Sequence, residues 1–126
     1  AAISCLKYLG KNDKQLVDKA ATDSMRNEIN KLKIKGVVVI GEGELDEAPM
    51  LHIGEKLGAG GDLELDIAVD PLEGTNFAAK NLPGALSVIS IAKKGDLFNA
   101  PETYMDKLAV SSKVPFEATD LDFPLD

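Results

Sequence analysis

The chain has 126 residues, 44% of them hydrophobic, one cysteine and a formal net charge of −7. This length is typical of one domain that can bury a core. The acidic balance argues against nucleic acid or an anionic membrane as a partner, because both attract Lys and Arg, and no apolar run is long enough to cross a bilayer. The lone Cys5 cannot form an intrachain disulfide, which fits a reducing compartment, and we expect it to be a small core residue rather than a reactive thiol.

The first elements are two helices. Residues 2–9 resemble the end of a helix, and Asp13 is a candidate N-cap for a second helix over residues 15–32. On a wheel of about 100° per residue, Asp18 falls on the apolar side of that second helix. An inward carboxylate is costly unless it is paired or bound to metal; otherwise Asp18 lies near enough to the helix start to reach solvent. The predicted apolar face consists of Val17, Ala21, Met25, Ile29 and Leu32.

A β-branched run over residues 37–40 predicts a strand that is covered on both faces. An acidic loop follows, with four acids within six residues that repel one another unless a cation lies among them. These acids are Glu42, Glu44, Asp46 and Glu47. A short helical stretch is predicted from Pro49 to about residue 58.

A second apolar strand over residues 65–69 leads directly into the run Asp70-Pro71-Leu72-Glu73-Gly74-Thr75. If this strand and residues 37–40 are parallel neighbours, their carboxyl ends and the acids that follow them meet at one edge of the sheet. Carboxylates without His or Cys nearby favour Mg²⁺ or Mn²⁺ over Zn²⁺. The N–H groups of Gly74 and Thr75, before a helix over 75–80, offer a seat for phosphate. The alternative is an ordinary turn, which Pro and Gly favour in any case.

The remaining elements are a strand over residues 86–91, a hairpin turn at 93–96 and a weak strand candidate at 108–110. The alternation of helices and strands predicts an α/β or layered α+β domain. Three further side chains are weaker candidates. His52 is the only histidine and is expected to be structural, while Lys14 and Tyr104 can each either contact a phosphate or serve ordinary solvated and packing roles.

Four segments in order carry a family resemblance: LGKNDK, VIGEGELDEAPML, DIAVDPLEGT and FNAPETYMDKL. With them the chain resembles class II fructose-1,6-bisphosphatase, a branch of the metal-dependent, lithium-sensitive phosphatases. The resemblance implies a layered α-β-α-β-α sandwich, of which residues 1–126 form an N-terminal, metal-binding portion. Because family members are well over twice as long, we expect a segment of a longer polypeptide. Asn12 replaces a common Gly of the first motif.

The resemblance also implies roles for individual residues. Asp18 and Glu42 would hold one metal ion, and Asp70 and Glu73 another. Asp46 and Thr75 would orient or deprotonate the attacking water. The residues implied to contact substrate are Lys14, Glu73, Gly74, Thr75 and Tyr104.

The implied reaction is Mn²⁺- or Mg²⁺-dependent hydrolysis of the 1-phosphate of fructose-1,6-bisphosphate in gluconeogenesis, with sedoheptulose-1,7-bisphosphate as a second substrate. A homo-oligomer in the cytoplasm, or in a plastid after removal of a transit peptide, is expected. Two alternatives stay open: a truncated module that binds metal or sugar phosphate without catalysis, and an inositol-monophosphatase-like enzyme that shares the hexapeptide but not the VIGEGE block.

Overall fold

The computed structural model describes residues 1–42, 50–98, 106–115 and 118–122. The predicted N-terminal helix is present as α1 (Ala2–Cys5) followed by the 3₁₀ helix η1 (Leu6–Tyr8). Helix α2 (Lys14–Ile29) begins where the sequence predicts, because an Oδ1 atom of Asp13 accepts the Leu16 N–H at 3.0 Å. The helix ends three residues earlier than predicted, so Leu32 lies beyond it and is 48% exposed.

The strands form one mixed sheet in the order β2-β1-β3-β4. Their bounds are β1 (Lys35–Ile40), β2 (Lys56–Leu57), β3 (Glu64–Glu73) and β4 (Leu86–Lys93), and helix α3 (Thr75–Ala79) connects the last two. Strands β1 and β3 are parallel neighbours, which is the condition for their carboxyl ends to meet at one edge, whereas β2 and β4 run antiparallel to their neighbours. None of the described helices is both long and apolar enough to span a membrane.

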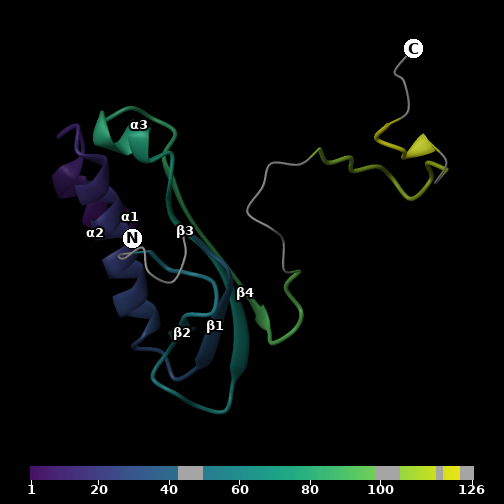
Figure 1. Cartoon of the computed structure of the whole chain (residues 1–126), viewed down its shortest axis with the longest axis horizontal. Helices are drawn as coiled ribbons and strands as arrows, with labels where there is room; N and C mark the ends of the chain where they lie inside the picture. The colour runs from purple at the N-terminus through teal and green to yellow at the C-terminus, as the bar shows by residue number, and fades with distance from the viewer. Residues whose placement is uncertain (43–49, 99–105, 116–117, 123–126) are drawn as a thin grey trace.

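The three labelled helices lie on one side of the sheet, with α2 running along it (Figure 1). Between α2 and the sheet lie two groups of buried side chains. One contains Met25, Ile29, Ile34, Val38, Leu51, Leu57, Ile67 and Val69, and the other Cys5, Val17, Ala21, Leu72, Ala78 and Ala79. The core assignment of Cys5 is therefore confirmed, and burial raises the pKa of its thiol.

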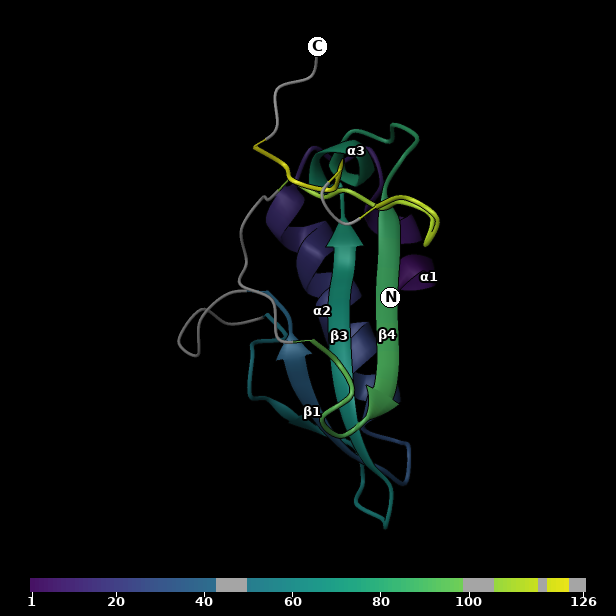
Figure 2. The same ribbon diagram turned by 90° about the vertical axis from the view of Figure 1, so that its right-hand side faces the viewer.

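The described residues place no layer over the second face of the sheet. In β1, Val38 is fully buried but Val37 and Val39 are only half-buried, so the expectation of cover on both faces is not met. Strand β4, at the sheet edge, is exposed along most of its length (Figure 2). The architecture shown is thus a mixed α/β sheet with helices on one side, and a five-layer sandwich is not shown.

Several local predictions are wrong. Residues 50–58, the described part of the helix predicted from Pro49, are not helical: they contain a turn at Ile53 and Gly54, followed by the short strand β2. Residues 108–110 are irregular rather than a strand, and no paired strand follows the turn at Lys94 and Gly95 among the described residues. The strand predicted over residues 65–69 does not end before Asp70 but continues, as β3, to Glu73.

The Asn12 backbone has a φ of +56°, a left-handed conformation that explains the Gly common at this position in the resembling family. Asn tolerates this conformation better than other residues with a Cβ. We therefore expect Asn12→Ala to lower the free energy of unfolding by about 1 kcal/mol and Asn12→Gly to leave it nearly unchanged. Thermal unfolding measures both, and Asn27→Ala on the exposed side of α2 is the control. Equal unfolding temperatures for the Ala and Gly variants at position 12 would contradict this reading.

Candidate functional site

Glu42, which follows β1, and Asp70, which lies within β3, are at corresponding positions along the two parallel strands. The parallel register pairs Ile40 with Ala68, and Glu42 and Asp70 each lie two residues further along. Neighbouring strands are about 4.8 Å apart, so the backbone that leads to Glu42 and the backbone that leads to Asp70 lie side by side at this edge of the sheet. Both are half-buried, so the edge is accessible to a ligand. The sequence-based expectation that strands β1 and β3 deliver acids to one edge is met by the register.

Asp70 and Glu73 form a pair of like charges. The hydrogen bond and charge repulsion between their carboxyl groups raise the pKa of Glu73. Asp70 also accepts the Leu72 N–H at 3.1 Å, which fixes one of its oxygens. The register with β4 shifts between Asp70 and Glu73, where Pro71 has no N–H to give to the ladder. The two carboxyl groups lie close enough to share a hydrogen bond, so a cation between them would relieve their repulsion.

The end of the hexapeptide is held by its own backbone. Gly74 has a φ of +77°, which turns the chain from β3 into α3. The Thr75 hydroxyl donates to the Leu72 carbonyl at 3.0 Å. Its proton is therefore engaged while its lone pairs stay free to accept from a water molecule. Gly74 and Thr75 are both half-buried and lie directly beside the Asp70–Glu73 pair in the chain.

Asp18 lies on the inner side of α2, as the wheel predicts, and is half-buried. Burial raises its carboxyl pKa, so the charge does not escape fully into solvent. One turn later, Thr22 is fully buried and its hydroxyl has no hydrogen-bond partner among the described residues. A buried hydroxyl without a partner costs free energy. The Thr22 hydroxyl therefore has a hydrogen bond to give or accept that the described residues leave unmade.

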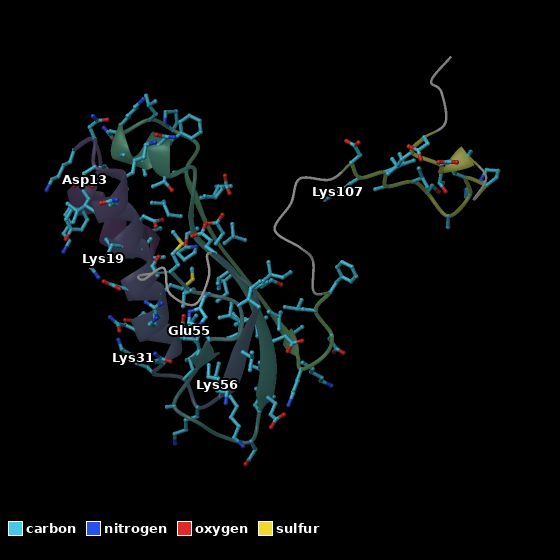
Figure 3. The ribbon with its side chains drawn as sticks, in the orientation of Figure 1. Asp13, Lys19, Lys31, Glu55, Lys56 and Lys107 are labelled. Atoms are coloured by element: carbon cyan, nitrogen blue, oxygen red, sulfur yellow. The ribbon has the colours of Figure 1, made fainter. Side chains whose placement is uncertain are left out.

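Lys14 lies at the same end of the molecule as α3. The loop before it is tied to that helix because the Gly10 and Asn12 N–H groups donate to the Ala78 and Ala79 carbonyls. Figure 3 shows Asp13, which caps α2, at this end of the structure. Lys14 itself is exposed. The first family motif therefore contacts helix α3, which begins at Thr75, the last residue of the third motif.

Two predicted site residues, Asp46 and Tyr104, lie outside the described residues, as do Glu44 and Glu47. Within the described ranges, no three acidic, His or Cys side chains are gathered as a ready cation site. What the structure does bring together is the Asp70–Glu73 pair and, at the same level, Glu42.

Two polar groups were missed by sequence reasoning. Asp66 is buried in β3 and accepts the Gly95 N–H at 2.7 Å, which fastens the turn after β4. An acid inside an apolar strand run was the available signal. Arg26 of α2 forms an ion pair with Glu55, which His52 also approaches at 3.4 Å. Arg26 and Glu55 are 29 residues apart in the sequence, so no local sequence pattern predicts their contact.

Replacing Asp18 should stabilise the metal-free protein. Its folded-state pKa is raised above the ordinary value of 3.8, so the folded state binds more protons and stability falls as the pH rises through this window. At neutral pH, Asp18→Asn removes a partly desolvated charge, and we expect a gain of less than about 1 kcal/mol because the side chain still contacts water. Thermal unfolding in EDTA measures it. Asp23→Asn, which breaks an exposed pair with Lys19, should give no gain, and a loss with Asp18→Asn would contradict the assignment.

The four motifs lie within a longer region of similarity to known proteins. A family model described as bacterial fructose-1,6-bisphosphatase, glpX-encoded, matches residues 1–126. The chain is 48% identical, over 99% of its own length, to fructose-1,6-bisphosphatase 1 class 2 of Escherichia coli, of which it spans 37%. It is 49% identical, over 86% of its length, to the class 2 D-fructose 1,6-bisphosphatase/sedoheptulose 1,7-bisphosphatase of Thermosynechococcus vestitus, of which it spans 35%. The chain thus spans little more than a third of these relatives, and it belongs to the family of class II, glpX-encoded fructose-1,6-bisphosphatases.

Proposed function

We propose that the polypeptide to which this chain belongs hydrolyses the 1-phosphate of fructose-1,6-bisphosphate, giving fructose-6-phosphate and phosphate, with Mn²⁺ or Mg²⁺ bound. The observation that carries the proposal is the common level of Glu42 and Asp70 at the β1–β3 edge, beside the repelling Asp70–Glu73 pair. Sedoheptulose-1,7-bisphosphate is a second substrate on this proposal, because the Thermosynechococcus relative is named for both bisphosphatase activities.

The donor set fits hard divalent cations. Asp18 and Glu42 would hold one ion and Asp70 and Glu73 the other, and all four offer carboxylate oxygens, the ligands preferred by Mg²⁺ and Mn²⁺. Two observations support this fit: the raised pKa values of Asp18 and Glu73, and the unpartnered Thr22 hydroxyl one turn from Asp18. When bound, such ions supply positive charge to the phosphoryl oxygens and make a water molecule more acidic.

The protein side chains would then position the reactants. The Thr75 hydroxyl, which donates a hydrogen bond to the Leu72 carbonyl, would accept a hydrogen bond from the attacking water. Asp46 would take the proton that this water loses. The Thr75 N–H would hold a phosphate oxygen, joined by the Gly74 N–H once it leaves the Glu73 carboxyl, with Lys14 and Tyr104 assisting. The new P–O bond forms as the bond from phosphorus to the sugar O1 breaks. That oxygen takes a proton from water and leaves as the sugar hydroxyl, and Asp46 returns its proton to solvent.

A non-catalytic role is the second candidate, because the chain spans only 35–37% of the length of the Thermosynechococcus and Escherichia coli relatives. On that proposal it binds divalent ions or sugar phosphates without turnover. Family membership favours the bisphosphatase over the inositol-monophosphatase alternative.

The finer fold, assembly and location are also proposals. A layered α-β-α-β-α sandwich is supported by the apolar side chains that β4 exposes, which the additional length present in the relatives would cover. We further propose a homo-oligomer of the longer polypeptide, acting in carbohydrate metabolism in the cytoplasm.

The test is phosphate release from fructose-1,6-bisphosphate by the polypeptide expressed from its complete reading frame. We expect turnover with Mn²⁺ or Mg²⁺ and none in EDTA. Mn²⁺ binding without turnover of either sugar bisphosphate would favour the non-catalytic role, and turnover that persists in EDTA would overturn the metal assignment.

A further inference from the structure

The two ends of the acidic loop are joined at its base. The Glu42 N–H donates to the Leu51 carbonyl at 3.1 Å, so the chain that leaves β1 meets the chain that returns toward β2. Further along the returning segment, the Val38 N–H donates to the Glu55 carbonyl at 2.9 Å and the Gly54 N–H to the Val38 carbonyl at 2.8 Å. Residues 50–55, here called the return segment, therefore fix the backbone from which Glu42 projects.

Arg26 ties this return segment to helix α2. Its Nε donates to Glu55 Oε1 at 2.6 Å and its Nη2 to Glu55 Oε2 at 3.2 Å, while Nη2 also donates to the Met50 carbonyl at 2.6 Å. One guanidinium thus holds both ends of the return segment. In Figure 3 the labelled Glu55 lies between α2 and the sheet. The Arg26 and Glu55 side chains are only 25% and 14% exposed, so water competes weakly for them.

The same helix carries Asp18. Arg26 lies eight residues after Asp18 in α2, which is about 12 Å along the axis at 1.5 Å per residue. A helix segment of this length is stiff, so anchoring the return segment at Arg26 fixes the Glu42 backbone relative to Asp18. The link runs from Asp18 along α2 to Arg26, across to Glu55 and Met50, and through Leu51 to Glu42.

We propose that the Arg26–Glu55 pair is a positioning device that sets Glu42 at the right distance from Asp18 to share a divalent cation. This inference rests on the proposed function. On this proposal Arg26 is not a ligand of the ion and acts through the return segment. Lys cannot replace it, because a single ammonium group cannot reproduce the two-pronged contact with Glu55 together with the contact to the Met50 carbonyl.

The test titrates Mn²⁺ by calorimetry into the metal-free polypeptide expressed from its complete reading frame, comparing wild type with Arg26→Lys and Glu55→Gln. We expect the Kd for Mn²⁺ to rise about 10- to 100-fold in both variants, as is typical when a residue that orients a metal ligand is changed. The stoichiometry should stay at the wild-type value, and saturating Mn²⁺ should restore kcat. Partial unfolding would instead lower the stoichiometry at an unchanged Kd, which separates positioning from general stability.

Lys31→Ala is the matched control, because it breaks an exposed ion pair with Glu28 near the end of the same helix and should leave the Kd unchanged. A Kd within twofold of wild type in both Arg26→Lys and Glu55→Gln, while Asp70→Asn still removes one of the two bound ions, would overturn the positioning role and leave the proposed function intact. If wild type and all variants bind no Mn²⁺, the proposed metal site fails and this inference fails with it. A fall in stoichiometry alone would also overturn it.

Discussion

Asp70→Asn, introduced into the polypeptide expressed from its complete reading frame, should lower kcat for phosphate release by about 10³-fold or more. The Asp70 carboxyl group hydrogen-bonds to and repels that of Glu73, so the two are placed to hold one of the proposed cations together. Asn keeps the size of the side chain but removes its charge. Loss of charge stabilisation worth several kcal/mol at the phosphoryl group corresponds to this drop, since each 1.36 kcal/mol is a factor of ten.

Asp66→Asn is a matched control on the same strand. The same Asp-to-Asn substitution is made at Asp66, four residues earlier in β3. Its carboxylate accepts the Gly95 N–H at 2.7 Å, a contact that the Asn side-chain oxygen can keep. We expect kcat within about threefold of wild type for this control. The measurement is initial phosphate release at saturating fructose-1,6-bisphosphate and Mn²⁺, with circular dichroism to verify folding. A folded Asp70→Asn variant with near wild-type kcat would exclude Asp70 as a metal ligand.

Much of the scaffold could be predicted because it depends on local patterns. Asp13 caps α2 as its position before the amphipathic run indicates, and the apolar runs became the parallel strands β1 and β3. The helical period of the apolar residues predicts that Asp18 lies on the side of α2 that faces the core. The carboxyl pKa of Asp18, which burial raises, agrees with this position. These features need only a repeat of 3.6 or 2 residues and a cap.

Features set by distant segments could not be predicted. Residues 56–57 became β2 because they pair with β1, which overrides a weak helical preference after Pro49. β3 extends through Pro71 because β4 pairs with it on both sides of that residue, at Asp70 and Glu73. The Arg26–Glu55 pair joins residues 29 apart and has no sequence period. Metal ligation by Asp18, Glu42, Asp70 and Glu73, and the roles of Asp46 and Tyr104, stay predictions.

Gly41→Ala should be the most destabilising small substitution near the proposed site. A Cβ at position 41 would lie 2.2 Å from the Leu51 carbonyl oxygen and 2.7 Å from a Val38 methyl group. Ordinary carbon–oxygen contacts are about 3.3 Å or longer, so the backbone of the return segment must move by roughly 1 Å. That movement breaks the bond from the Glu42 N–H to the Leu51 carbonyl, which sets where Glu42 projects. We expect a loss of about 3 kcal/mol in the free energy of unfolding, typical of severe overpacking, and a fall in Tm of about 10 °C.

Gly54→Ala separates steric collision from backbone strain. Gly54 lies in the same return segment with a φ of +91°, and a Cβ there would meet nothing within 4 Å. Its replacement carries only the strain of a left-handed residue, about 1 kcal/mol. Thermal unfolding of the metal-free proteins compares the two variants, and calorimetry with Mn²⁺ then follows the site. If the loop base positions Glu42, Gly41→Ala weakens Mn²⁺ binding while Gly54→Ala does not, because only the former displaces the partner of the Glu42 N–H. Equal destabilisation by the two variants would mean that the close approach at Gly41 relaxes freely and does not fix the loop.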